Sequence, residues 1–300
     1  MTIRKLGTID YQIVETTPFV FGGRIILLET IVEDYPQNHT GKRYLRCRDV
    51  ESGRIYPAFG WLHSFASAYT EGGVGWVFAP NENITGRYFN PDGGKYVQVF
   101  RSKDMHDWAE ISRFDAQNEG RIWNTSVCKS EGRYVMAYET DDPDYYPKFT
   151  IKFAGSPDLI HWTKIMGTIY GEDRYTGCPT LRYYNGWFYL ICLERRNSDP
   201  LFPEWYFEEI IARSRDLIHW ERSTKNPLLT PSPEDRLIFH PDVRLTGREV
   251  NINNSDIDFC EFQDKTVIFY AWGDQLGIHF LARAEYADSE KEFLESYFKV

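Results

Sequence analysis

Ser102-Lys103-Asp104-Met105-His106-Asp107-Trp108 is the first of three copies of one phrase, S-x-D-[LM]-x-x-W. The second copy spans residues 156–162 and the third spans 214–220, so the copies start 54 and 58 residues apart. A nearly constant spacing of this size is typical of stacked or radial repeats. Serine and aspartate side chains bond to neighbouring backbone in tight turns, and a tryptophan can cover such a turn as an apolar plug. The phrase therefore predicts a repeated structural turn and leaves the chemistry to other residues.

Around these turns the sequence reads as a strand, a short turn and a second strand, a pattern typical of β-hairpins. Five such hairpins are predicted, at residues 19–29, 65–79, 125–139, 179–194 and 256–272. A third strand is expected after each, at residues 44–49, 96–101, 150–154, 208–213 and 278–284, followed by an outer fourth strand. Five four-stranded antiparallel units predict an all-β fold, a five-bladed β-propeller that spans residues 1–300 as one domain. Residues 6–14 and 292–300 are the candidates for strands that close the ring.

Composition narrows the class of ligand. The 300 residues are 42% hydrophobic, include 20 Tyr, 20 Phe and 9 Trp, and carry a formal net charge of −10. The apolar content suffices for a core, and the negative charge argues against nucleic acid or an anionic membrane as a partner, because both bind basic surfaces. Aromatic rings together with carboxylates suit a neutral, hydroxyl-rich ligand such as a sugar, although aromatics also fill β cores.

The five cysteines are Cys47, Cys128, Cys178, Cys192 and Cys260. They are scattered, odd in number and form no C-x-x-C pair, which favours reduced thiols over disulfides or a zinc site. The N-terminal residues show no apolar signal-peptide core, and no run of about 18 apolar residues occurs. We therefore expect a cytoplasmic protein with no membrane partner, while its oligomeric state stays open.

The three phrases and the five hairpin units resemble the five-bladed glycosidase propellers, the grouping of glycoside hydrolase families 32, 43, 117 and 130. That resemblance implies the propeller fold, and the grouping contains hydrolases, transglycosylases and phosphorolytic enzymes on one scaffold. Family 43 members place Asp, Asp and Glu at the starts of innermost strands. Of the corresponding starts here, only Asn254-Ser255-Asp256 carries a carboxylate, and the N-D-P-N-G motif of family 32 is missing. The chain therefore resembles a divergent member to which no catalytic triad can be transferred.

Propeller geometry places the start of each innermost strand and the end of each second strand on one face, around a central funnel. Three predicted second-strand ends carry Glu29, Glu139 and Glu194, and Asp256 stands at an inner-strand start. Repeated carboxylates at the ends of apolar strands are costly to bury, which favours a functional role. We expect inverting hydrolysis with Glu194 as acid, Asp256 as base and Glu139 tuning the acid, across a gap of roughly 6.5–9.5 Å. The alternative for each carboxylate is a salt-bridged or solvated rim position.

Substrate-binding residues are expected on the same rim. The predicted set is Glu29, His63, Trp123, Asn124, Arg195, Asn254, Trp272, Asp274 and Gln275. Tryptophan rings would stack on a sugar and Asn254 would bond its hydroxyls; alternatively, these residues cover blade junctions and cap a strand start. No cofactor and no metal ligands are predicted, although a calcium or other cation in the central channel, with His279 beside it, is left open.

Three functions fit these patterns. The first is an exo-acting glycosidase that hydrolyses short oligosaccharides. The second is a phosphorolytic enzyme of the family 130 kind, for which Arg24, Arg195 and Arg196 could supply a phosphate site. The third is a glycan-binding propeller without catalysis, which would be consistent with the missing triad.

Overall fold

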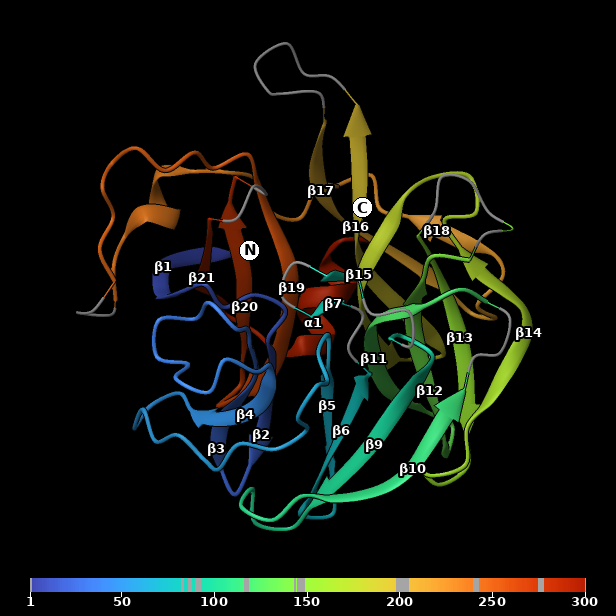
Figure 1. Ribbon diagram of the computed structural model, residues 1–300. Helices are drawn as coiled ribbons and strands as arrows, with labels where there is room; N and C mark the ends of the chain where they lie inside the picture. Colours follow the sequence, from blue (N-terminus) through green and yellow to red (C-terminus); the bar gives the residue numbers. More distant parts are fainter. Residues whose placement is uncertain are drawn as a thin grey trace.

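The computed structural model describes residues 2–81, 84–85, 88–89, 93–115, 119–142, 144, 149–197, 205–239, 243–274 and 278–299. Its antiparallel sheets stand one after another around a central axis, in chain order (Figure 1). The first blade contains β2 (Thr17–Phe21), β3 (Arg24–Ile31) and β4 (Tyr44–Asp49). The second contains β5 (Ser67–Glu71), β6 (Val74–Pro80), β9 (Tyr96–Ser102) and β10 (Ala109–Asp115), and the short strands β7 (Ile84–Thr85) and β8 (Tyr88–Phe89) form a separate pair.

The remaining three blades have four strands each. The third contains β11 (Ile122–Ser130), β12 (Arg133–Thr140), β13 (Thr150–Ser156) and β14 (Thr163–Tyr170). The fourth contains β15 (Thr176–Tyr184), β16 (Trp187–Asn197), β17 (Trp205–Ser214) and β18 (Trp220–Arg222). The fifth contains β19 (Asn253–Phe262), β20 (Lys265–Gly273), β21 (His279–Tyr286) and the N-terminal strand β1 (Arg4–Tyr11). The prediction of an all-β, five-bladed propeller is confirmed.

All five inner hairpins turn through two residues that both have positive φ. The turn pairs are Gly22-Gly23, Gly72-Gly73, Glu131-Gly132, Asn185-Gly186 and Gln263-Asp264, with φ between 48° and 83°. Two central residues of positive φ define the type I′ turn, whose twist matches that of the flanking strands. The predicted hairpins are therefore present, and each has the same two-residue turn.

The repeated phrase forms the turn that was expected. In the first copy, Ser102 Oγ accepts the N–H of Met105 at 2.9 Å, and Asp104 Oδ1 accepts the N–H of His106 at 2.8 Å. The Trp108 indole donates to the carbonyl of Met105 at 3.3 Å and stacks on Phe59 with ring centroids 4.3 Å apart. Equivalent aspartate and tryptophan bonds recur in the copies at 156–162 and 214–220. The phrase is structural in all three blades.

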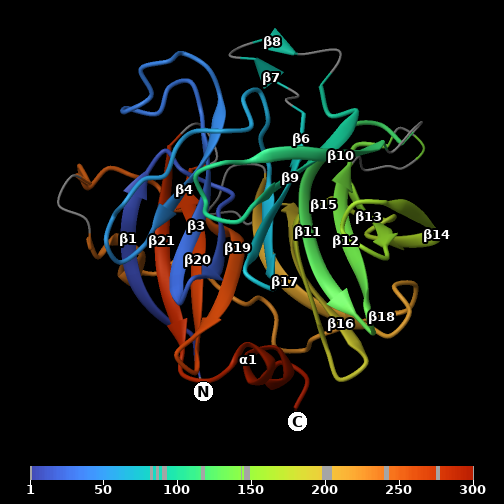
Figure 2. The ribbon, with the colours of Figure 1, turned by 90° about the horizontal axis from the view of Figure 1, so that it is seen from below.

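Two details of the blades differ from expectation. Only the N-terminal candidate closes the ring, because β1 pairs with β21, whereas the predicted strand at 292–300 overlaps helix α1 (Glu290–Ser296). Figure 2 shows α1 beside both chain termini. Its buried Phe293 and Leu294 follow a helical rather than an alternating pattern. In the first blade the fourth strand is replaced by an irregular segment, in which Phe59 exchanges backbone hydrogen bonds of 2.9 Å with Leu45.

Apolar side chains fill the junctions between neighbouring blades. Five clusters of buried residues occur, and each joins two adjacent sheets, including the last blade to the first. At that closing junction, Ile25 and Leu27 of β3 pack with Phe269 of β20. Within the described residues, no helix is long and apolar enough to cross a membrane.

Candidate active site

One residue of each blade occupies the same position near the start of the inner strand. Counting back seven residues from the first turn residue gives Glu15, Phe65, Asn124, Cys178 and Asp256, which we call the axial ring. All of these residues except Asn124 have a positive φ, between 49° and 56°. A left-handed residue at a β-bulge redirects its side chain relative to the strand. All five side chains contribute to one cavity of about 700 Å³.

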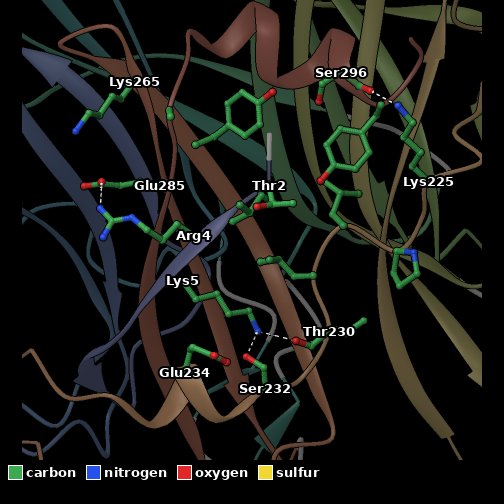
Figure 3. Close-up of a pocket in the computed structure, with 17 residues that line it drawn as sticks. Thr2, Arg4, Lys5, Lys225, Thr230, Ser232, Glu234, Lys265, Glu285 and Ser296 are labelled. Carbon is green, nitrogen blue, oxygen red and sulfur yellow. Dashed lines mark hydrogen bonds and ion pairs between the residues drawn. The ribbon is translucent and has the colours of Figure 1, made fainter. Parts of the chain in front are cut away.

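A larger groove, of about 1030 Å³, lies elsewhere, between β1, residues 225–234 and the C-terminal residues. Figure 3 shows Lys5 pointing toward Thr230 and Ser232, to which its ammonium donates at 2.6 and 3.1 Å. Arg4 pairs with Glu285 at 2.9 Å in the same groove. Its carboxylates, Glu234 and Glu285, do not converge with other carboxyls in the lining, so volume alone does not mark the site. The smaller cavity brings titratable groups together on the axis.

Glu139, on β12, is the buried carboxylate of this cavity. Its Oε2 accepts the N–H of Cys178 at 2.8 Å and the side-chain amide of Asn124 at 2.9 Å. Burial raises the pKa of Glu139 to about 7, the charge of Asp256 adds to this rise, and the two hydrogen bonds oppose it. Gly177 leaves room for the carboxylate, because a Cβ at that position would lie 3.0 Å from Glu139 Oε1. A carboxyl of this pKa can exchange a proton near neutrality.

Glu15 and Asp256 approach each other from the first and fifth blades. One oxygen of each, together with the sulfur of Cys178, lies within 4.8 Å of the others. Burial raises the pKa of Glu15 well above its ordinary value, and the charges of Asp256 and Glu139 raise it further, while Arg43 opposes the shift. Two carboxyls this close favour a shared proton and a single negative charge.

The three donor atoms of Glu15, Cys178 and Asp256 would also fit around a divalent cation. However, burial raises the pKa of the Cys178 thiol well above its ordinary value, which favours the protonated thiol that does not bind metals. We assign no metal to this cluster. Of the acidic run at 141–144, Asp141 pairs with Arg121, and Asp142 pairs with Lys152 at 2.6 Å.

The prediction that three glutamates occupy equivalent second-strand positions around the funnel is wrong, because they differ in register. Glu29, Glu139 and Glu194 are respectively the fifth, sixth and seventh residues after the residue that closes each hairpin turn. Since side chains alternate between the two faces of a strand, Glu29 and Glu194 face away from the side that Glu139 occupies. A shift of one residue therefore separates the site carboxylate from the other two.

Glu29 and Glu194 are buried in ion pairs outside the cavity. Glu29 lies between two guanidinium groups, 2.7 Å from Arg46 and 2.5 Å from Arg48. Glu194, the expected general acid, accepts hydrogen bonds from Tyr170 at 3.1 Å, Arg174 at 3.0 Å and Arg222 at 2.8 Å. The salt-bridged alternative thus describes both residues, and neither lines the cavity.

Two of the predicted binding residues, Trp123 and Asn124, line the cavity, as does His279. Trp272 does not: it is 1% exposed, stacks on Phe280 at 4.4 Å and donates to Thr8 Oγ1 at 2.8 Å. It belongs to the core because β20 turns its side chain toward β21 and β1.

Asn254 and His63 also lie outside the cavity lining. Asn254 is buried and bonds to Lys5 at 2.6 Å and to Asp235 at 3.2 Å, so its polar atoms serve an internal network. His63 packs edge-on against Phe100 and contacts the carbonyl of Trp61 at 3.0 Å.

The last three predicted binding residues lie near strand ends. Arg195 is exposed near the end of β16, and Asp274 accepts the N–H of Ile278 at 3.2 Å. Neither residue lines the cavity. Gln275 lies outside the described residues.

Two members of the site, Glu15 and Cys178, are absent from the set predicted from the sequence. Glu15 lies before the first predicted hairpin at residues 19–29, and Cys178 is predicted only as one of five reduced thiols. The signal that finds both is the constant distance to the hairpin turn, which the type I′ pairs mark clearly.

No protein-family model matches the sequence, and no curated protein matches it. Solved structures do resemble it. A complex of BT0996 with RGII superposes with a TM-score of 0.64 at 15% identity, over 94% of this protein and 91% of BT0996. The GH93 α-L-arabinofuranosidase of Fusarium graminearum, solved with arabinobiose, superposes with a TM-score of 0.60 at 13% identity. The match covers 95% of this protein and 97% of the arabinofuranosidase. A third structure superposes with a TM-score of 0.58 at 14% identity, over 95% of this protein and 86% of the other chain. It is reported for the GH130 family of mannoside phosphorylases, which contains glycoside hydrolases that target β-1,2 mannosidic linkages in Candida mannan.

At these identities the likeness establishes the fold. The chain is a divergent five-bladed propeller of the kind found among glycoside hydrolases. What it does must be argued from its own cavity.

Proposed function

We propose that the protein is a glycoside hydrolase whose reaction takes place in the axial cavity. The observation that carries the proposal is the convergence of Glu139, Glu15 and Asp256 from three different blades. Glycoside hydrolysis needs one carboxyl that donates a proton to the leaving oxygen and one carboxylate that activates water or attacks the sugar. Environments that push the pKa values of neighbouring carboxyls apart provide these two roles, and burial raises the pKa of Glu139 to about 7.

In this proposal Glu139 takes the role of general acid that was expected of Glu194, and Asp256 remains the base. Glu15 and Asp256 are neighbours, because one oxygen of each lies within 4.8 Å of the other. We assign them together to the water-activating side and Glu139 to the acid side, the two roles that hydrolysis requires. Burial raises the pKa of Glu15 well above its ordinary value, so Glu15 would keep its proton beside Asp256. Inversion at the anomeric carbon stays a prediction, and proton NMR of the first product tests it.

Hydrolysis is favoured over phosphorolysis by the charges of the cavity. The arginines expected to bind phosphate lie elsewhere: Arg24 pairs with Asp49 at 3.3 Å and Arg196 with Glu208 at 2.7 Å. Among the described residues that line the cavity, Arg43 is the one guanidinium, and it contacts Glu33 at 3.1 Å. A phosphate dianion would therefore meet mostly carboxylates. Phosphate dependence of product formation separates the two reactions.

The substrate class remains a glycan or glycoside, attacked from one end. A cavity of about 700 Å³ holds a small ligand rather than a long chain, which supports exo action. The relation to family 43 and a cytoplasmic location also remain predictions. The location is supported by the five cysteines, which are all free thiols.

The proposal is tested with a broad panel of aryl glycosides and oligosaccharides. Glu139→Gln and Asp256→Asn should each lower kcat by about 10²–10⁴-fold, as expected for loss of a general acid or base. Glu51→Gln, at an exposed carboxylate, should leave kcat unchanged. Sugar binding by calorimetry without turnover across the panel would instead favour the glycan-binding alternative. Hydrolysis retained within tenfold in both site variants would rule out these roles.

A further inference from the structure

Five aromatic rings form a continuous wall along one side of the axial cavity. They are Phe65, Trp123, Phe149, Tyr175 and Phe207, which we call the aromatic arc, and all five line the cavity. Successive ring centroids along the arc lie 5.3, 5.5, 5.0 and 5.4 Å apart. Each of these residues is only half-buried, so the arc keeps apolar surface exposed to the cavity. Apolar surface gathered inside a cavity is typical of a ligand site.

Two members of the arc are held in an unfavourable backbone conformation. Phe65 has φ of 55° and Phe149 has φ of 76°. Positive φ is uncommon for a bulky residue, and such strain persists mainly at ligand sites and clamps. The conformation of Phe65 belongs to the inner-strand bulge of the repeat, so Phe149 is the residue whose strain points to a ligand site. The strained backbone therefore supports a binding role for the arc.

The side of the cavity formed by the first and fifth blades carries polar groups beside Val14 and Val32. The polar groups are those of Gln12, Glu33 and Arg43 from the first blade and its N-terminal approach, and of His279 from the fifth blade. Glu15 and Asp256 lie on this side as well. The hydroxyl groups of a sugar need hydrogen-bond partners, and this side supplies them. The sugar undergoing hydrolysis thus fits against the first and fifth blades.

The proposed acid lies on the side of the arc. Glu139 belongs to β12, between Trp123 of β11 and Phe149, which directly precedes β13. Tyr175 lies close to Glu139, whose charge, after burial, raises the pKa of the Tyr175 phenol. A general acid donates its proton to the leaving oxygen, so it faces the leaving group. The arc, which flanks this acid, therefore surrounds the place of the leaving group.

We infer that the aromatic arc binds an aromatic leaving group, so that the substrates of this site are aryl glycosides that release a phenol. This inference rests on the proposed function and specifies its substrate class. In the reaction, the Glu139 proton passes to the glycosidic oxygen, and the bond from that oxygen to the anomeric carbon breaks with its electron pair on the oxygen. Water forms the new bond to the anomeric carbon and gives its proton to Asp256. The products are the free sugar and the phenol.

Binding of the leaving group can be measured without knowing the sugar. The probe is 2-naphthol, and its binding to the 300-residue chain is to be measured by isothermal titration calorimetry. We expect 2-naphthol to bind, and Phe149→Ala and Phe207→Ala each to weaken this binding about tenfold or more, as expected from the loss of a buried aromatic contact. Phe239→Ala is the matched control, because Phe239 is 61% exposed and does not line the cavity. Circular dichroism of each variant checks that it is folded before binding is measured. The two arc variants provide independent tests.

Kinetics then separate this inference from the proposed function. For a sugar that the enzyme accepts, the phenyl glycoside is compared with a disaccharide of the same sugar. Phe149→Ala and Phe207→Ala should lower kcat/KM for the phenyl glycoside about tenfold and change it for the disaccharide less than twofold. Equal losses on both substrates, or 2-naphthol binding that the arc variants do not change, would overturn the aromatic leaving group while hydrolysis stands. Intact 2-naphthol binding without turnover of any glycoside would overturn the proposed function.

Discussion

Glu139 and Glu194 show how environment separates two identical side chains. Both are buried near the end of a second strand, but Glu194 contacts Arg174 and Arg222 at 3.0 and 2.8 Å, whereas Glu139 accepts neutral N–H donors from Asn124 and Cys178. Burial without a cationic partner favours the neutral acid, and burial raises the pKa of Glu139 to about 7. Only the second environment suits a proton donor.

The pH profile should report the ionisation of Glu139. As a general acid it must be protonated, so kcat/KM should fall about tenfold per pH unit above its pKa of about 7. The Asn124 hydrogen bond stabilises the anion and lowers this pKa, so Asn124→Ala should move the alkaline limb to higher pH.

Thr30→Val is the control for this shift, because Thr30 lines the cavity from β3 in the first blade. Its profile should keep the alkaline limb of the unmodified enzyme. If the alkaline limb of the kcat/KM profile stays in place in Asn124→Ala, the ionisation that it reports belongs to a group other than Glu139.

At the scale of elements, a buried carboxyl links the third blade to the inner strand of the fourth, and another links the fourth blade to the inner strand of the fifth. Glu139 of β12 accepts the N–H of Cys178 on β15, and Glu209 of β17 accepts the N–H of Ile257 on β19 at 3.1 Å. Both N–H groups lie at or next to an axial-ring residue with positive φ. The bulge leaves these N–H groups without a ladder partner, and the carboxyls satisfy them. Burial and the charge of Asp256 raise the pKa of Glu209 well above its ordinary value.

The turn that follows the third strand in the second, third and fourth blades depends on its aspartate. Asp104 Oδ1 accepts the N–H groups of His106 at 2.8 Å and Asp107 at 3.0 Å. Asp104→Ala removes these acceptors and should lower the free energy of unfolding and the midpoint of urea denaturation, because two N–H groups of the turn lose their partners. Asp107→Ala alters an exposed carboxylate of the same turn and should have little effect. Urea denaturation compares the two variants, and an equal loss in both would contradict the structural role of Asp104.

At the scale of the whole molecule, the ring is closed by an N-terminal strand on the last blade. β1 pairs with β21, and an apolar cluster joins the fifth blade to the first. Closure also uses the buried Thr8 of β1, whose hydroxyl accepts from the Trp272 indole at 2.8 Å and donates to the Asp235 carbonyl at 2.6 Å. The first strand β1 and the last strand β21 are thereby held in one sheet.

Thr8→Val keeps the shape of the side chain and removes both hydrogen bonds. The buried N–H of Trp272 and carbonyl of Asp235 would lose these partners, so the free energy of unfolding should fall by about 1–3 kcal/mol. Thr2→Val, at an exposed position, is the matched control. Glycosidase activity at 25 °C should be unchanged, since Thr8 does not line the cavity. Stability equal to that of Thr2→Val would show that closure does not depend on the hydroxyl.

Much of the fold could be predicted because its signals are local. The Ser102–Trp108 turn, the Gly22-Gly23 hairpin and the strand at 44–49 each depend on contacts between residues close in sequence. The prediction of a strand at residues 292–300 was wrong. Phe293 and Leu294 are buried against the fifth blade, and this burial selects the helix. Glu15 and Cys178 were missed because strand boundaries are less certain than turns.

The amino-acid sequence alone specifies the repeat, its turns and the presence of carboxylates near the strand ends. Tertiary structure was needed to decide which carboxylates face the cavity. A single residue of register reverses the face of a side chain, and Glu29, Glu139 and Glu194 differ by one residue in their distance from the hairpin turn. Long-range partners completed the selection: arginines of neighbouring strands enclose Glu29 and Glu194, whereas Glu15, Glu139 and Asp256 meet on the axis.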